Sequence, residues 1–106
     1  MDLVLGLDVG TTAVKGMACD RKGQPYRIAS CKIDLKVIRT GWVEQEPQEI
    51  WNAVVSVCRQ INGQLLEGDR ICAISLSSQG ATTIPVDSTG NPTHVAFSWM
   101  DERAGE

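Results

Sequence analysis

The stretch Leu3–Lys15, LVLGLDVGTTAVK, decides the fold of this 106-residue chain. Its first part, Leu3 to Asp8, alternates weakly and reads as a mostly buried strand, and Ala13 to Asp20 reads as a second strand. The glycine-containing turn between them, Val9 to Thr12, predicts a β-hairpin. A third strand-like run from Tyr26 to Leu35 extends the hairpin into a three-stranded meander.

From Pro47 onward the hydrophobic periodicity changes to that of a helix. Pro47 suits a first helical turn, and Glu46 and Glu49 complement the positive end of the helix dipole. Either Gly63 or Gly68 can end the helix. Apolar residues recur at three- and four-residue spacing, which predicts one buried face made of Ile50, Trp51, Val54, Val55, Cys58, Ile61 and Leu65.

The remaining segments are shorter. Val37 to Pro47 is predicted to be irregular, and three β-rich runs follow the helix: Arg70–Leu76, Thr82–Val86 and Val95–Trp99. Two turns, Asp20–Pro25 and Asp87–Pro92, both read D-x-x-G-[Q/N]-P, with the glycine placed to take a positive φ. Two strand-rich units around one helix predict the α/β class, a mixed β-sheet with a covering helix.

Composition excludes several kinds of partner. The net charge is −3, so the chain has no basic footprint and we expect no nucleic-acid partner. No stretch approaches the ~20 apolar residues of a membrane span, so no membrane partner is expected. Asp2 stands where a signal peptide has a basic residue, and Asp8 and Gly10 interrupt the apolar run. We therefore expect a soluble, cytoplasmic protein.

The four cysteines are spaced for neither disulfide nor zinc chemistry. They contain no C-x-x-C pair, and His94 is the only histidine. All four fall in apolar strand-like or helical runs, where free cysteine behaves as a small hydrophobe. We therefore expect buried, reduced thiols, as in a cytosolic protein, at Cys19, Cys31, Cys58 and Cys72.

The turn after the first strand has the chemistry of a phosphate site. A phosphate group needs backbone N–H donors, hydroxyl donors and no bulk, which Gly10, Thr11 and Thr12 offer together. Asp8 ends the strand beside this turn, where one carboxylate is enough for a hydrated Mg²⁺ ion, and Lys15 adds positive charge. The alternative is a hairpin loop whose Asp8 bonds its own turn. The motif is neither a Walker A loop nor a Rossmann fingerprint.

Four motifs in order resemble the first part of the FGGY carbohydrate kinases. They are DVGTTAVK (8–15), GWVEQEP (41–47), SSQGATTIPVD (77–87) and FSWMDERA (97–104). The resemblance covers Leu3 to Ala104, and GWVEQEP is its most specific part. It implies a mixed sheet of the ribonuclease-H-like, actin-like ATPase type. It also implies ATP-dependent phosphorylation of a sugar or polyol hydroxyl, with ATP and Mg²⁺ as cofactors.

The resemblance also implies roles for individual residues. Residues 41–47 match a segment that looks structural, in which Trp42 packs while Glu44 and Gln45 hold the loop by hydrogen bonds. Trp99 matches an aromatic that lies against the acceptor's carbon chain, although a partly buried tryptophan at a strand end is an equal alternative. Arg103 is expected to be a salt-bridge partner at a helix start rather than a ligand. The implied site residues are Gly10, Thr11, Thr12 and Lys15 for the ATP phosphates, Asp8 for the metal, and Gln79, Gly80, Ala81, Trp99 and Asp101 for the sugar or polyol.

One departure from the family pattern bears on the acceptor. Glycerol kinases resemble this segment but carry arginine and glutamate directly after the glutamine, and xylulose kinases resemble it with methionine and histidine there. This chain has Gly80 and Ala81 instead. Glycerol is therefore disfavoured and the standard xylulose pattern is not met, which leaves room for a bulkier or differently oriented polyol.

The catalytic base is not evident in this sequence. In the family it is an aspartate much later in the chain, and the aspartates at 20, 34, 69 and 87 do not look like a base. We therefore expect residues 1–106 to be the N-terminal portion of the first kinase domain, lacking the C-terminal domain and inactive alone. A truncated sheet leaves an open edge, so the fragment is expected to form a homodimer or otherwise self-associate.

Two other functions stay open. One is a non-catalytic module of the same ancestry that binds a sugar or phosphate. The other is a different actin-like ATPase, such as an acetate kinase or chaperone relative, which would share the D-x-G-T turn. The motifs G-W-V-E-Q and W-x-D-x-R-A favour the kinase over this second alternative. Only sequence beyond Glu106 could separate the kinase from a non-catalytic module.

Overall fold

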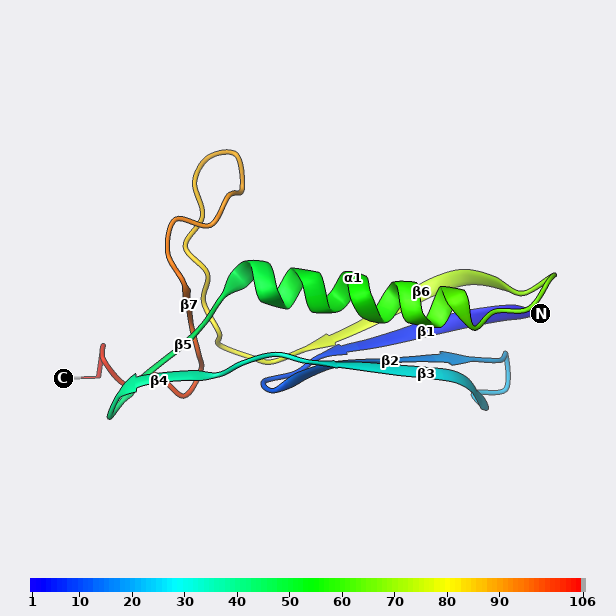
Figure 1. Ribbon diagram of the computed structural model, residues 1–106, viewed down its shortest axis with the longest axis horizontal. Coiled ribbons are helices and arrows are strands. Elements are labelled where there is room, and N and C mark those ends of the chain that lie inside the picture. Colours follow the sequence, from blue (N-terminus) through cyan, green and yellow to red (C-terminus); the bar gives the residue numbers. More distant parts are fainter. Residues whose placement is uncertain (106) are drawn as a thin grey trace.

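The computed structural model describes residues 1–105, which form an elongated molecule of 53 × 28 × 18 Å (Figure 1). Its strands make two sheets, a four-stranded and a three-stranded one, and its helix covers the first. The elements in chain order are β1 (Asp2–Val9), β2 (Ala13–Cys19), β3 (Pro25–Lys32), β4 (Lys36–Arg39), β5 (Trp42–Gln45), α1 (Pro47–Gly63), β6 (Arg70–Ser78) and β7 (Ala96–Phe97).

The four-stranded sheet has the order β3-β2-β1-β6. The predicted meander is confirmed, because β1 pairs antiparallel with β2 and β2 antiparallel with β3. β6 then pairs parallel to β1. A parallel pair needs a long crossover connection, which here contains α1. The predicted mixed sheet with a covering helix is therefore the observed architecture.

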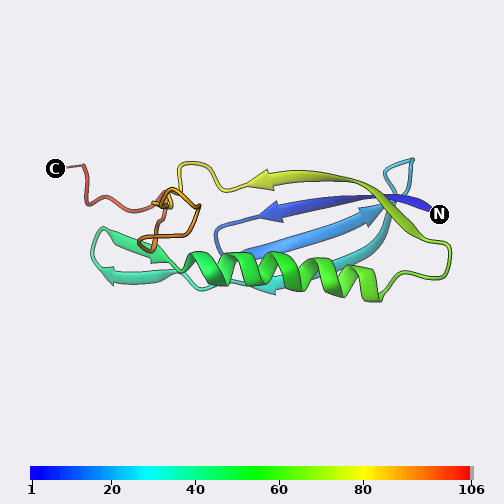
Figure 2. The ribbon, with the colours of Figure 1, turned by 90° about the horizontal axis from the view of Figure 1, so that it is seen from above.

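The core lies between α1 and one face of this sheet (Figure 2). Alternate residues of β1 are buried, with Leu3 fully enclosed, and Val57 and Ile61 of α1 are 0% and 1% exposed. Gly16 of β2 lies directly beneath them. A Cβ at this position would lie 2.5 Å from Val57 Cγ1 and 2.8 Å from Ile61 Cδ1. The absence of a side chain at Gly16 therefore lets the helix approach the sheet closely.

The helix has the predicted ends, and its buried face agrees with the prediction in part. It starts at Pro47 and its last residue is Gly63, as expected. Ile61 is buried as predicted, and the predicted residues that pack against the core while partly buried are Ile50, Val54, Cys58 and Leu65. Ala53 and Val57 are also buried, although the apolar spacing had not selected them, and Trp51 is 61% exposed. The prediction followed the large apolar residues, but the helix turns the face that fits against Gly16 toward the sheet.

Residues 37–47 were predicted to be irregular, and this prediction is wrong. They contain most of the β4–β5 hairpin, whose turn is made by Gly41 at a φ of 79°. β7 completes the three-stranded sheet with the order β4-β5-β7. The four residues of β4 are all exposed, so they show no alternation that could have indicated a strand.

Two predicted strands after the helix are reduced or absent. Thr82–Val86 contains only isolated bridges, from Thr83 to Phe97 and from Val86 to Pro92. Of the predicted run Val95–Trp99, only Ala96–Phe97 forms a strand. The chain between Thr82 and β7 projects away from both sheets (Figure 1).

The two D-x-x-G-[Q/N]-P turns are alike, as predicted. Gly23 and Gly90 have φ values of 79° and 85°. In each turn the first aspartate accepts two backbone hydrogen bonds with Oδ1, at 2.8 and 2.9 Å for Asp20 and at 2.9 and 3.0 Å for Asp87. The aspartate and the glycine therefore both stabilise the turn.

All four cysteines are free thiols, as predicted, but their predicted burial is wrong for Cys72. It is exposed because β6 lies at the sheet edge, whereas Cys19, Cys31 and Cys58 are half-buried. None of the described helical residues belongs to a helix long and apolar enough to cross a membrane.

Candidate functional site

The turn between β1 and β2 presents donor groups at one end of the sheet. Gly10 donates its N–H to the carbonyl of Ala13 at 3.0 Å, so this N–H closes the turn. The carbonyls of Thr11 and Thr12 accept from Gln45 Nε2 at 2.6 Å and from the N–H of Ile33 at 3.0 Å. The backbone N–H groups of Thr11 and Thr12 have no acceptor within residues 1–105. Together with two hydroxyls, they are the donors this turn offers to an anion.

Asp8 and Lys15 face each other across the hairpin. They are directly paired in register, both are exposed, and Asp8 is paired with Ser77 of β6 on its other side. Asp8, Lys15 and Ser77 line a hollow of about 460 Å³ on the sheet face away from α1. β1 and β6 are parallel, and both carboxyl ends lie here, which is where open α/β sheets commonly bind ligands.

Asp8 is the carboxylate available for a metal ion in this region. Within residues 1–105, no three histidine, cysteine, aspartate or glutamate side chains gather as a metal-binding group. A Mg²⁺ ion at Asp8 would therefore take its other ligands from water and phosphate oxygens, which is common for this ion.

Trp99 joins the far segment of the chain to this turn. Its indole Nε1–H donates to Thr11 Oγ1 at 3.0 Å, although the two residues are 88 positions apart. Its backbone N–H donates to Thr82 Oγ1 at 3.1 Å. The indole is 52% exposed, so one edge of the ring is fixed while much of it stays open to a ligand.

Gln79 connects the end of β6 to the same turn. Its backbone N–H donates to the carbonyl of Val9 at 2.9 Å, and its Nε2 donates to the carbonyl of Gly10 at 3.3 Å. The Oε1 of Gln79 accepts from the Thr82 hydroxyl at 3.0 Å. The structure therefore brings Gln79, predicted to bind the sugar or polyol, against Gly10 and, through Gln45, close to Thr11, both predicted to bind phosphate.

The two residues after Gln79 leave open space. A Cβ at Gly80 would meet no atom within 4 Å. Ala81 has a φ of 61°, a left-handed conformation that is uncommon for residues other than glycine and that is found at binding sites. A hollow of about 460 Å³ lies beside them, lined by Ala81, Thr83, Phe97, Ser98, Trp99, Asp101, Arg103 and Ala104.

Asp101 is engaged in protein contacts. Its two carboxylate oxygens each accept from Arg103 Nε at 2.9 Å, and Oδ2 also accepts from Arg103 Nη2 and the N–H of Val43, each at 2.7 Å. The Arg103 hydrogen bonds lower the pKa of Asp101 to about 2. Arg103 also donates to Glu44 at 2.7 Å, and its own pKa is raised, mainly by Asp101. The salt bridge expected of Arg103 is confirmed, but no helix starts beside it within residues 1–105.

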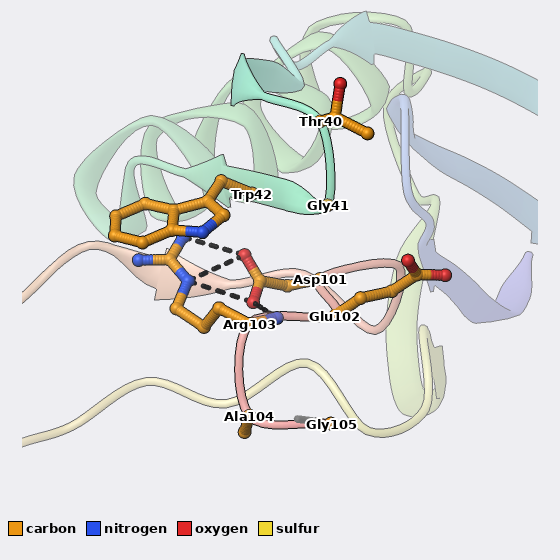
Figure 3. Close-up of a pocket in the computed structure, with 8 residues that line it drawn as sticks. All are labelled: Thr40, Gly41, Trp42, Asp101, Glu102, Arg103, Ala104 and Gly105. Carbon is orange, nitrogen blue, oxygen red and sulfur yellow. Dashed lines mark hydrogen bonds and ion pairs between the residues drawn. The ribbon is translucent and has the colours of Figure 1, made fainter.

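A larger hollow, of about 570 Å³, is lined by this ion pair together with Thr40–Trp42, Glu102, Ala104 and Gly105 (Figure 3). The Arg103 guanidinium stacks on the Trp42 ring, 4.0 Å from the ring centroid. The Arg39 guanidinium lies over the same ring, 3.9 Å from its centroid. The structure thus explains the string GWVEQEP: Gly41 makes the turn, Trp42 packs, and Glu44 and Gln45 form hydrogen bonds. These expectations for Trp42, Glu44 and Gln45 are confirmed.

Sequence reasoning missed two contributions to the site. Gln45 was expected to hold its own loop, but it also contacts Thr11 and receives a hydrogen bond from Gln79 at 3.0 Å. Thr82 was assigned to a strand, whereas its hydroxyl connects Gln79 and Trp99. The only signal for Gln45 is its place in the short alternation of β5, and no signal in the sequence points to Thr82.

The fold and these contacts define the class, a ribonuclease-H-like domain of the actin-like ATPase type. Residues 3–106 match the model of the N-terminal domain of the FGGY family of carbohydrate kinases. The chain therefore belongs to the FGGY family of carbohydrate kinases.

Relatives and solved structures agree with this assignment. Glycerol kinase of Burkholderia cenocepacia (strain HI2424) is 37% identical over 105 residues, which are 97% of this chain and 21% of the relative. Xylulose kinase of Lactobacillus acidophilus superposes with a TM-score of 0.91 at 30% identity, over 99% of this chain and 21% of that chain. Gluconate kinase of the same organism gives 0.91 at 30% identity, over 98% and 21%. The chain spans about a fifth of the length of these proteins.

Proposed function

We propose that this chain supplies the first phosphate loop and part of the acceptor site of an ATP-dependent sugar or polyol kinase. The observation that carries this proposal is the hydrogen bond from the Trp99 indole to the Thr11 hydroxyl. It puts an exposed aromatic surface, suited to a carbon chain, beside a turn with free N–H and hydroxyl donors. Membership of a carbohydrate kinase family supports phosphoryl transfer as the chemistry.

The division of roles follows from what phosphoryl transfer requires. The reaction depends mainly on positioning and on neutralising phosphate charge. Thr11 and Thr12 would donate to phosphate oxygens and Lys15 would add positive charge, with Gly10 shaping the turn. Asp8 would hold Mg²⁺, which supplies further charge neutralisation when bound.

On the acceptor side, we propose contacts from Gln79, Gly80, Ala81 and Trp99. Asp101 stays a predicted contact of the sugar or polyol. The lone pairs of its carboxylate already accept hydrogen bonds from Arg103 and Val43. A base that takes the proton of the acceptor hydroxyl is also needed. We place it outside residues 1–106, so this chain alone is expected to bind and not to turn over substrate.

The proposed acceptor is a sugar or polyol other than glycerol. The curated relatives described above include a glycerol kinase. However, Gly80 and Ala81 carry no charge that could hold small hydroxyls, and a hollow lies beside Ala81. This space supports an acceptor larger than glycerol. The free thiols further support a reducing compartment, such as the cytoplasm, as the place of action.

The test is a kinase assay on the protein expressed from the complete open reading frame, with ATP, magnesium and a panel of xylulose, gluconate and glycerol. We expect Asp8→Asn to reduce kcat at least about 100-fold through lost metal binding, and glycerol to be the poorest acceptor. Asp20→Asn makes the same charge change in a remote turn and should leave kcat unchanged. Equal loss in both variants would refute the role of Asp8.

Two outcomes separate the alternatives. Nucleotide and sugar binding without any turnover by the complete protein would favour a non-catalytic module over a kinase. Turnover by residues 1–106 alone, above the uncatalysed rate, would show that the base lies within them.

A further inference from the structure

Five residues, Thr11, Gln45, Gln79, Thr82 and Trp99, are joined in a closed ring by five hydrogen bonds. The ring runs from the Trp99 N–H to Thr82 Oγ1 at 3.1 Å, and from the Thr82 hydroxyl to Gln79 Oε1 at 3.0 Å. It continues from Gln79 Nε2 to Gln45 Oε1 at 3.0 Å and from Gln45 Nε2 to the Thr11 carbonyl at 2.6 Å. The Trp99 indole, bonded to Thr11 Oγ1 at 3.0 Å, closes it.

The donor and acceptor atoms of this ring can be assigned in one way only. Gln45 Nε2 faces two carbonyls, those of Thr11 at 2.6 Å and Asp34 at 3.4 Å, so this end must be the amide nitrogen. Its oxygen is then left to accept from Gln79. Gln79 Nε2 also faces the Gly10 carbonyl, which leaves its oxygen to accept from Thr82. Four successive bonds donate in the same direction, from the Trp99 N–H through Thr82, Gln79 and Gln45 to the Thr11 carbonyl, whereas the indole bond runs directly from Trp99 to Thr11. The four linked bonds polarise and strengthen one another.

Gln45 is the buried member of the ring, and its burial excludes other arrangements of these hydrogen bonds. It is 1% exposed, and no buried side-chain nitrogen or oxygen within residues 1–105 lacks a partner. Turning its amide would set a carbonyl oxygen against the carbonyls of Thr11 and Asp34. A buried polar group without a partner costs far more than an ordinary hydrogen bond gains. The ring therefore holds its segments in one mutual placement.

We propose that Gln45 is a positioning residue that couples the phosphate loop to the acceptor pocket beside Trp99. The proposal rests on the proposed function, in which Thr11 faces the phosphates and Trp99 the acceptor. Gln45 lines neither the hollow at Asp8 nor the hollow at Trp99. It acts through Thr11 and Gln79, so ordering one side of the ring by a ligand orders the other side.

The first experiment needs no ligand. Hydrogen exchange is measured on the backbone N–H of Gly10, on the phosphate side of the site, and of Gln79, on the sugar or polyol side, and on that of Leu5 in the core. Gln45→Met keeps the side-chain length and removes its polar atoms. We expect it to speed exchange at Gly10 and Gln79 by about tenfold more than at Leu5. Gln48→Met, the same change on the exposed side of α1, should have no such effect.

Two results of this experiment overturn the proposal. One is uniform acceleration at all three positions, which means that Gln45 contributes only to global stability. The other is acceleration at one end of the site alone. If Gln45→Met does not fold, Gln79→Met breaks the same ring from a half-buried position, and it should then accelerate exchange at Gly10.

The second experiment measures cooperativity in the complete protein. The affinity for a magnesium complex of a non-hydrolysable ATP analogue is determined with and without saturating D-xylulose or gluconate. We expect a coupling factor of at least about 5 in the unchanged protein and close to 1 in Gln45→Met. A factor that survives in a destabilised Gln45→Met protein refutes a positioning role. If neither ligand binds the wild-type protein, the proposed function is wrong. The hydrogen-exchange data alone then test whether Gln45 is a positioning residue.

Discussion

The two ends of the molecule are stabilised in different ways. Around α1 and the four-stranded sheet the buried residues are apolar, with Leu3, Val14, Val57 and Ile61 almost fully enclosed. Around the three-stranded sheet the buried side chains include polar ones, most of all Gln45. This end is stabilised by the ion pairs of Arg103 with Asp101 and Glu44 and by the ring of hydrogen bonds through Gln45.

This difference separates the source of folding stability from the contacts that position the candidate site residues. Apolar burial is non-directional and roughly proportional to the area removed from water. Hydrogen bonds and ion pairs inside a protein depend on geometry, and each buried polar group needs its partner. The apolar end can therefore supply most of the folding free energy, while the polar end determines where the candidate site residues lie.

The largest expected effect tests the apolar end. Ile61→Ala should lower the free energy of unfolding by about 3 kcal/mol, because it leaves a cavity against Gly16 and the sheet. Ile74→Ala, the same change at a side chain that is 64% exposed, should cost less than about 0.5 kcal/mol. Urea denaturation measures both, and equal losses would contradict the burial of Ile61 between the helix and the sheet.

The close approach of helix and sheet gives the second prediction. Gly16→Ala should destabilise by about 2 kcal/mol, since its methyl group would overlap Val57 and Ile61. Gly6→Ala is the control in the neighbouring strand, where a Cβ would come no closer than 3.8 Å to the Met17 carbonyl. Thermal unfolding of both variants is the measurement. A harmless Gly16→Ala would mean that α1 lies farther from β2.

The polar end should respond to acid. The pKa of Asp101 is lowered from 3.8 to about 2, so its ionised form stabilises the folded state. This contribution is complete above about pH 4 and is lost as the pH falls through 2. Asp101→Asn should therefore lower stability at pH 6 and flatten its decline between pH 4 and pH 2. Urea titrations across this range check the sign, and an unchanged decline would contradict the ion pair.

The smallest effect concerns association. We propose that the chain self-associates through β6, an edge strand on which Ile74 and Leu76 are 64% and 67% exposed. Leu76→Lys should then reduce the sedimenting mass at high concentration. Leu66→Lys, at a loop residue that is 63% exposed, should not. A strict monomer at every concentration tested would rule out the proposal.

Much of the first sheet could be predicted because its signals are local. The alternation of β1 and β2 and the turn between them lie in adjacent residues, and Pro47 and Gly63 mark the helix ends. Hairpin and helix signals of this kind need no distant partner. The α/β fold class and the motifs that resemble the FGGY family could likewise be recognised from residues adjacent in sequence.

The errors occur where a partner decides the structure. The buried face of α1 depends on Gly16, which is far away in sequence, so the exposure of Trp51 could not be read from helical spacing. β4 is exposed throughout and is a strand only because it pairs with β5. Thr82–Val86 has the composition of a strand, but no continuous neighbour lies beside it.

The sequence by itself determined the hairpin, the helix limits and the residue types of a phosphate turn, because each depends on residues that are neighbours along the chain. Only the tertiary structure decided that Thr11 lies against Trp99, that Arg103 reaches Glu44, and that Gln45 joins the turn to Gln79. The physical reason is that these hydrogen bonds join groups up to 88 positions apart. Their formation requires the sheets to be in place first.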